Sequence, residues 1–153
     1  MTVSIALAGA GAFGHKHLDG LASVEGAEVV AVVDPVEAAA HKAAGAHGIA
    51  HAATDLDEVL ARDDVDAVIL ATPTPMHAPQ ALACLEAGKH VQVEIPLCDR
   101  LDGGRVVAEA QRTTGLVAMV GHTRRFNPSH QWVRRRIDSG DYTIQHMDVQ
   151  TFF

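Results

Sequence analysis

The stretch Val-Ser-Ile-Ala-Leu-Ala-Gly-Ala-Gly-Ala-Phe-Gly, residues 3–14, decides the fold of this chain. Its apolar start predicts a buried strand, and its three glycines predict a tight turn into a helix. Gly9 lets the backbone turn sharply, Gly11 leaves room for a phosphate, and Gly14 lets the helix lie close to the sheet. Free N–H groups at the helix start favour an anionic ligand. The expected dinucleotide-binding turn consists of Gly9, Ala10, Gly11, Ala12, Phe13 and Gly14.

The overall composition is typical of a globular protein. The 153 residues are 48% hydrophobic and 20% charged, and the net charge is −7. A chain of this length holds one complete domain and a second only in part. Because an acidic surface repels phosphate backbones and anionic headgroups, we expect neither a nucleic-acid partner nor a membrane partner.

Cysteine and histidine usage gives no indication of a metal centre. Cys84 and Cys98 stand in unrelated contexts, so free thiols in a reducing compartment are the simpler interpretation. The ten histidines are scattered, and no metal site is expected. No apolar run approaches ~20 residues and no charged leader precedes the first strand, which together favour a cytoplasmic location.

Apolar runs alternate with helical patterns as far as residue 120. The strands expected after the first are Val29–Val33, a short edge strand at Gly48–His51, Ala67–Ala71, Val91–Glu94 and Leu116–Val120. Thr54 is the expected N-cap of the helix that precedes Ala67. The runs are too continuously apolar for strands with one solvated face. The pattern therefore predicts an α/β fold, a doubly wound parallel sheet with helices on both faces.

The character of the sequence changes at residue 121. Residues 122–127 are polar and basic, Pro128 is expected to begin a helix that Gly140 ends, and Thr143–Phe153 is predicted to be a long strand. One helix and one strand cannot bury a core. We therefore expect a dinucleotide-binding domain at 1–121. At 122–153 we expect the beginning of a substrate and oligomerisation domain whose remainder is absent from the chain.

The helix expected after Pro128 carries a run of arginines in its last turns, Arg134–Arg136. Cations there suit the helix dipole and stay solvated, which is the simple interpretation of the run. An interdomain or subunit contact is the alternative. Trp132, on the same helix, is expected to pack against its neighbours.

Asp34 follows the second expected strand, twenty residues after Gly14. A carboxylate at this point accepts hydrogen bonds from both ribose hydroxyls of an adenosine and repels a 2′-phosphate. No lysine or arginine occurs in the next seven residues, so NAD is favoured as the cofactor, with NADP as the alternative. A second interpretation, compatible with the first, is that Asp34 caps the following helix.

Polar or proline-rich clusters follow several of the expected strands. They are Gly9–Gly14, Asp34, Thr72–Pro75, Glu94–Pro96 and Gly121–Arg125. In an open parallel sheet, ligands bind beyond the carboxyl ends of the strands, so these clusters are expected to share one rim. Each cluster alone is also compatible with an ordinary strand-to-helix turn.

Four stretches resemble the glucose–fructose oxidoreductase/inositol dehydrogenase (Gfo/Idh/MocA) family: the glycine turn and residues 66–77, 87–96 and 124–128. The resemblance covers nearly the whole chain. It implies an NAD(P)-dependent oxidoreductase with an N-terminal Rossmann domain. It also implies a C-terminal α/β domain, built on an open sheet, through which we expect a homo-oligomer to form.

The resemblance implies roles for individual residues. The glycine turn would hold the pyrophosphate and Asp34 the ribose, and the further cofactor contacts would be Thr72, Pro73, Thr74, His77 and Glu94. The implied substrate contacts are Pro96, His122, Arg124 and Arg125. No catalytic residue is assigned. Ile95 occupies the place of the lysine in the family's Glu-Lys-Pro signature. That lysine polarises or deprotonates the substrate hydroxyl, which an isoleucine cannot do.

Within the family, residues 91–97, 120–131 and 145–153 are similar to a dehydrogenase of aromatic-compound degradation that also carries the isoleucine. That enzyme oxidises the cyclic hemiacetal of a dicarboxylic semialdehyde to a pyrone dicarboxylate. A small dicarboxylate substrate suits Arg124 and Arg125, since guanidinium groups bind carboxylates in a bidentate manner. The alternatives are a sugar or inositol dehydrogenase of the same family and a non-catalytic dinucleotide-binding domain.

Overall fold

The computed structural model describes residues 2–148 of the chain. The chain divides into two compact units, residues 1–121 (the first unit) and residues 122–153 (the second unit). Each unit is described by itself.

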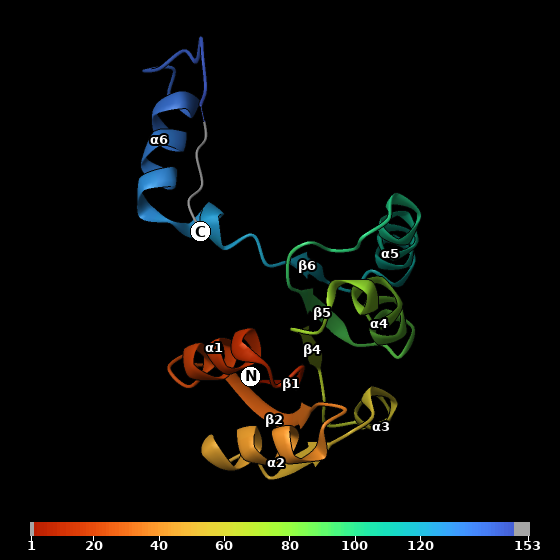
Figure 1. Ribbon diagram of the computed structural model, residues 1–153. Helices are drawn as coiled ribbons and strands as arrows, with labels where there is room; N and C mark the ends of the chain where they lie inside the picture. Colours follow the sequence, from red (N-terminus) through yellow and green to blue (C-terminus); the bar gives the residue numbers. More distant parts are fainter. Residues whose placement is uncertain (1, 149–153) are drawn as a thin grey trace. The chain divides into compact units, whose positions relative to one another are not determined.

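A parallel sheet forms the centre of the first unit. Its strands, six within the described residues, are β1 (Val3–Ala8), β2 (Ala27–Val33), β3 (His51–Ala53), β4 (Ala67–Leu70), β5 (His90–Val93) and β6 (Ala118–Val120). Their order in the sheet is β3-β2-β1-β4-β5-β6, and every neighbouring pair is parallel (Figure 1). The prediction of a doubly wound parallel sheet is confirmed.

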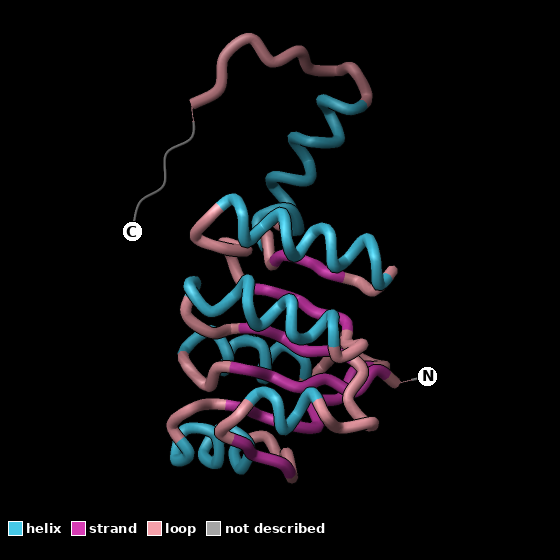
Figure 2. The backbone as a smooth tube through the Cα atoms, turned by 90° about the vertical axis from the view of Figure 1, so that its right-hand side faces the viewer, coloured by secondary structure: helices cyan, strands magenta, loops and turns pink. Residues whose placement is uncertain are grey.

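Helices cover both faces of this sheet, as Figure 2 shows. They are α1 (Ala12–Leu21), α2 (Glu37–Ala46), α3 (Leu56–Leu60), α4 (Thr74–Glu86) and α5 (Leu101–Thr114). Leu7 of β1 packs on the α1 and α2 side with Leu18, whereas the neighbouring Ala8 packs on the opposite side with Cys84 of α4. Successive strand residues point to opposite faces, so a continuously apolar strand supplies both cores.

Local structure differs from expectation around residues 48–57. The edge strand β3 begins at His51 rather than Gly48, because Gly48 has a φ of +68° and so cannot be part of an extended strand. The cap of α3 is Asp55 rather than Thr54: the Asp55 carboxylate accepts a hydrogen bond from the backbone N–H of Asp57 at 3.0 Å.

The second unit contains a short 3₁₀ helix, η1 (Thr123–Phe126), and the helix α6 (Pro128–Asp138). Asn127 caps α6 by accepting a hydrogen bond from the backbone N–H of Ser129 at 3.0 Å. Neither helix buries a residue. The expected strand at Thr143–Phe153 is wrong over residues 143–148, which contain no strand, and its remainder lies outside the described residues. A strand needs a partner, and the described residues of this unit provide none.

Side chains of α6 make local contacts on the surface. Arg134 pairs with Asp138, and Arg136 pairs with Asp141 while lying over the ring of Trp132. Trp132 also meets Tyr142 edge-on, with the ring centroids 6.0 Å apart, yet 47% of it stays exposed. Within residues 2–148, no helix combines the length and apolar character that crossing a membrane requires.

Candidate active site

The three glycines of the turn between β1 and α1 have different neighbours. Gly9 has a φ of +98°, and a Cβ there would lie 2.5 Å from the carbonyl oxygen of Ala71. A Cβ on Gly14 would lie 1.9 Å from the carbonyl oxygen of Gly9. A Cβ on Gly11 would meet nothing within 4 Å. The fold itself therefore requires Gly9 and Gly14, whereas the space beside Gly11 is open to a ligand.

Asp34 ties the glycine turn to the end of β2. One carboxylate oxygen accepts a hydrogen bond from the backbone N–H of Ala10 at 2.8 Å, and the other accepts from the N–H of Val36 at 2.9 Å. Val36 is the N-cap residue of α2, so the carboxylate also orders the entry to that helix. A carboxylate has about four lone-pair sites, and Asp34 is only half-buried. Acceptor capacity therefore remains for a ligand hydroxyl.

A cavity of about 530 Å³ lies at the carboxyl ends of β1, β2 and β4. Among the residues expected to bind the cofactor, Gly9, Gly11, Asp34, Thr72 and Pro73 line it. In the strand order, β1 stands between β2 and β4, so the chain runs outward in opposite directions on its two sides. Ligands of doubly wound sheets bind at such a reversal. This cavity is therefore the candidate cofactor site.

The same cavity contains residues that the sequence reasoning missed. They are Thr54, Asp55, Leu56, Met76 and Gln80. Gln80 lies one turn and a half into α4, and its side-chain oxygen accepts a hydrogen bond from the Thr72 hydroxyl at 2.6 Å. Polar residues at the start of α3 and α4 are an ordinary signal of helix capping, and nothing in their spacing indicates a ligand.

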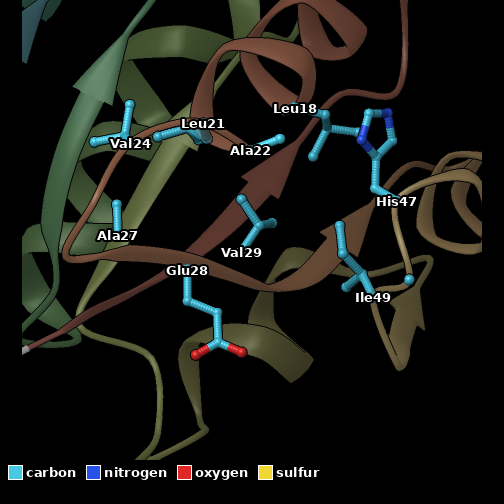
Figure 3. A pocket seen from close by; sticks show the side chains of 10 residues that line it. Leu18, Leu21, Ala22, Val24, Ala27, Glu28, Val29, His47 and Ile49 are labelled. Carbon is cyan, nitrogen blue, oxygen red and sulfur yellow. The ribbon is translucent and has the colours of Figure 1, made fainter.

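A second cavity, of about 240 Å³, lies near the start of β2, at the other end of that strand (Figure 3). Leu18, Leu21, Val29 and Ile49 contribute apolar side chains, and the carboxylate of Glu28 extends away from them in Figure 3. None of the residues expected to bind cofactor or substrate lines it. It is separate from the candidate cofactor site.

Glu94, directly after β5, is held by a histidine that the sequence reasoning missed. The imidazole Nε2 of His17, on α1, lies 2.7 Å from one carboxylate oxygen of Glu94. A Cβ on Gly121, directly after β6, would lie 3.2 Å from the same oxygen. The ends of β5 and β6 and the middle of α1 thus converge on this carboxylate. His17 and Glu94 are 77 residues apart in sequence, so no local pattern could have paired them.

His77, one of the predicted cofactor contacts, is a buried residue of α4. It is only 1% exposed, so it does not reach the surface of the cofactor cavity. Its two ring nitrogens lie 2.7 Å from the carbonyl oxygens of Thr72 and Pro96. That His77 contacts the cofactor stays a prediction; in the structure its ring contacts the backbone of two loops.

The residues expected to contact substrate fall in both units. Pro96 follows a cis peptide bond in the first unit, and the adjacent Ile95 is 51% exposed. The second unit contains His122, Arg124 and Arg125, and all three residues are exposed to solvent. The ring of His130 donates a hydrogen bond from Nδ1 to the carbonyl oxygen of Arg124 at 3.1 Å. That bond fixes η1 against α6.

Two features bear on other kinds of chemistry. Burial raises the pKa of the Cys84 thiol to about 12, so this cysteine stays protonated and is a poor nucleophile at neutral pH. Within residues 2–148, no group of three or more histidine, cysteine, aspartate or glutamate side chains is arranged to hold a metal ion.

Comparison with protein families gives two matches. Residues 3–122 match the model of the oxidoreductase family with an NAD-binding Rossmann fold, Gfo/Idh/MocA. Residues 128–153 match the model of the C-terminal region of bacterial oxidoreductases.

Among curated proteins, the chain is 59% identical over 149 residues to a 4-carboxy-2-hydroxymuconate-6-semialdehyde dehydrogenase from Sphingobium sp.. That match covers 97% of this chain and 47% of the relative. A scyllo-inositol 2-dehydrogenase (NAD(+)) from Bacillus subtilis is 38% identical, with 91% of this chain and 41% of the relative covered. The chain thus spans less than half the length of these relatives.

Solved structures of dehydrogenases have a fold similar to that of this chain. A putative myo-inositol dehydrogenase from Sinorhizobium meliloti has a TM-score of 0.85 at 36% identity. The scyllo-inositol dehydrogenase from Lactobacillus casei, solved with bound NAD(H) and scyllo-inositol, has a TM-score of 0.88 at 26% identity. Each comparison covers 92% of this chain and 42% of the other.

Proposed function

This chain belongs to the Gfo/Idh/MocA oxidoreductase family, and from that membership we propose that its protein is an NAD-dependent dehydrogenase of 4-carboxy-2-hydroxymuconate-6-semialdehyde. The product would be 2-pyrone-4,6-dicarboxylate, formed from the cyclic hemiacetal of the substrate. The observation that carries the proposal is the identity of 59% with the semialdehyde dehydrogenase, against 38% with the inositol dehydrogenase.

The cofactor part of the proposal rests on the cavity at the ends of β1, β2 and β4. The open space beside Gly11 suits a pyrophosphate at the start of α1, where the helix dipole favours negative charge. The half-buried Asp34 carboxylate suits a ribose diol and disfavours a 2′-phosphate. NAD is therefore proposed over NADP. When bound, it supplies the acceptor for a hydride.

The substrate part of the proposal rests on charge and on Ile95. The substrate carries two carboxylates, and Arg124 and Arg125 can each bind one in a bidentate manner. His122 and Pro96 complete the proposed contacts. Oxidation removes a hydride from the carbon that bears the hemiacetal hydroxyl, together with the hydroxyl proton. A hemiacetal hydroxyl is more acidic than that of an ordinary alcohol, so the reaction depends less on a lysine at position 95.

An inositol dehydrogenase is the second candidate, favoured by the relatives and solved structures that carry that name. Its substrate hydroxyl is an ordinary alcohol, for which the exposed Ile95 offers neither charge nor proton transfer. A non-catalytic dinucleotide-binding protein is the third. The first two candidates share the cofactor site and differ in the substrate.

The deciding experiment is a turnover assay of the full-length protein in which this chain occurs. Reduction of NAD is followed by absorbance with the semialdehyde and, separately, with myo-inositol and scyllo-inositol. We expect turnover with the semialdehyde alone. Turnover confined to the inositols would favour the second candidate, and calorimetric NAD binding without any turnover would favour the third.

Arg124 provides a sharper test of the substrate contacts. We expect Arg124→Ala to raise the KM for the semialdehyde about tenfold or more, because one charge-assisted pair of hydrogen bonds is lost. The KM for NAD serves as the internal control and is expected to stay unchanged. Unchanged kinetics for the semialdehyde would remove Arg124 from the proposed site.

A further inference from the structure

Among the described residues, His77 is the one polar or charged side chain in the buried core. It is the fourth residue of α4 and is 1% exposed. Ring nitrogen Nε2 lies 2.7 Å from the carbonyl oxygen of Thr72, and Nδ1 lies 2.7 Å from the carbonyl oxygen of Pro96. Both distances lie at the short end of the range for N–H···O hydrogen bonds, where charge-assisted bonds are found.

The two partners of the ring determine what its nitrogens must do. A carbonyl oxygen can only accept a hydrogen bond, so each nitrogen has to donate. A neutral imidazole has one N–H, and only the doubly protonated ring has two. Two carbonyl dipoles aimed at the ring offset part of the cost of burying its charge.

The two carbonyls belong to loops on neighbouring strands. β4 and β5 are paired as far as Leu70 and Val93, and the N–H of Glu94 still donates to the carbonyl oxygen of Leu70 at 2.9 Å. Beyond that point the strands are followed by two loops, residues 71–73 and residues 94–97. The ring of His77 joins these two loops at Thr72 and Pro96.

The first of these loops forms part of the candidate cofactor cavity, through Thr72 and Pro73. The second carries Ile95, at the position of the family's signature lysine. A bond that fixes one loop against the other therefore sets the spacing between the cofactor site and the signature segment. Misplacement by about 1 Å can strongly weaken binding or catalysis.

We propose that His77 is a positioning residue, which donates hydrogen bonds from both ring nitrogens and so holds the 71–73 and 94–97 loops in their binding arrangement. It touches neither cofactor nor substrate. The effect of His77 on NAD binding rests on the proposed function, whereas the hydrogen bonding of its ring does not.

The direct test is a long-range ¹H–¹⁵N correlation spectrum of the histidine rings of the ¹⁵N-labelled chain at pH 7, without NAD. His77→Gln, which removes one ring signal, assigns the resonance. We expect both ring nitrogens of His77 to be protonated. A ring with one protonated and one bare nitrogen would overturn the proposal, because only one loop would then be held.

The second test measures NAD affinity by calorimetry. His77→Phe keeps a buried ring without donors, and we expect about a tenfold or greater loss of affinity. His77→Gln keeps an amide donor and is expected to recover part of that loss. His41→Phe, the same change at a largely exposed histidine of α2, is the control and should bind like the wild type.

The outcomes separate the two proposals. Circular dichroism establishes that each variant is folded, and the ring spectrum decides the matter if His77→Phe does not fold. A folded His77→Phe chain with unchanged NAD affinity would overturn the positioning role. Failure of the wild-type chain to bind NAD would instead overturn the proposed function and leave the ring spectrum valid.

Discussion

The two units of this chain differ in how their residues are held. In the first unit, Leu7 and Leu18 are buried on one face of the sheet and Ala8 and Cys84 on the other, and the cofactor cavity lies at the ends of three of its strands. In the second unit, the helices bury nothing, and Arg124 is placed by local bonds within η1 and α6. The cofactor site is therefore supported by a buried core. The segment that carries the arginines proposed to bind the substrate carboxylates is instead held by hydrogen bonds at helix ends and by ion pairs on the surface.

The largest expected effect comes from Gly14. We expect Gly14→Ala to lower the free energy of unfolding by about 3 kcal/mol, because the new Cβ would clash with the carbonyl oxygen of Gly9. Urea unfolding measures the loss. The control is Gly20→Ala in the same helix, where a Cβ meets nothing within 4 Å. It should raise stability by about 0.5–1 kcal/mol, since alanine favours helix interiors.

Equal stabilities for the Gly14→Ala and Gly20→Ala variants would contradict the close contact between α1 and the glycine turn.

Asp34 is expected to have a smaller effect on stability and a large one on binding. Asp34→Ala leaves the N–H groups of Ala10 and Val36 without their carboxylate acceptor, which costs about 1–3 kcal/mol of unfolding free energy. NAD affinity, measured by calorimetry, should fall about tenfold or more. Asp34→Asn keeps the shape and one acceptor oxygen, so it should retain most of the stability.

The same Asp34→Asn variant tests the choice of cofactor. Removing the negative charge should narrow the preference for NAD over NADP, because a 2′-phosphate is no longer repelled. An unchanged ratio of the two affinities would mean that Asp34 serves only to hold the turn and to order α2.

The smallest expected effect is a difference in stability between the two units, which Trp132 can report. Trp132 is the chain's single tryptophan, so its fluorescence reports on the second unit, while far-ultraviolet circular dichroism reports mainly on the first. Because α6 buries no residue, we expect the fluorescence transition at a lower urea concentration than the dichroism transition. Coincident transitions would contradict independent stability of the two units.

The sequence predicts the parallel sheet well because β1, β2 and β4 each contain an uninterrupted apolar run, and the glycine turn and Asp34 directly follow two of these runs. Details set by one or two bonds were harder to predict. Asp55, not its neighbour Thr54, accepts the hydrogen bond from the backbone N–H of Asp57 in α3, and the positive φ of Gly48 means that the edge strand begins only at His51. Both are choices between adjacent residues that local propensity does not resolve.

The site was predictable where it depends on chain order and unpredictable where it depends on contacts across the fold. The strand order brings Asp34 and Thr72 to one cavity. Their positions directly after parallel strands are enough to predict this. The pairing of His17 with Glu94, and the burial of His77 between two carbonyls, arise from the packing of α1 and α4. A histidine in a sequence does not reveal whether it faces a ligand or a backbone.

The most direct test of the central claim, that the first unit holds NAD in the cavity at the ends of β1, β2 and β4, is an NAD titration of the ¹⁵N-labelled chain followed by its backbone amide resonances. We predict the largest shifts at residues 9–14, 34–36, 54–56 and 71–76. Residues 123–140 and the second cavity around Leu18 and Ile49 should change little. Shifts concentrated in either of those regions, with the glycine turn unaffected, would contradict the account.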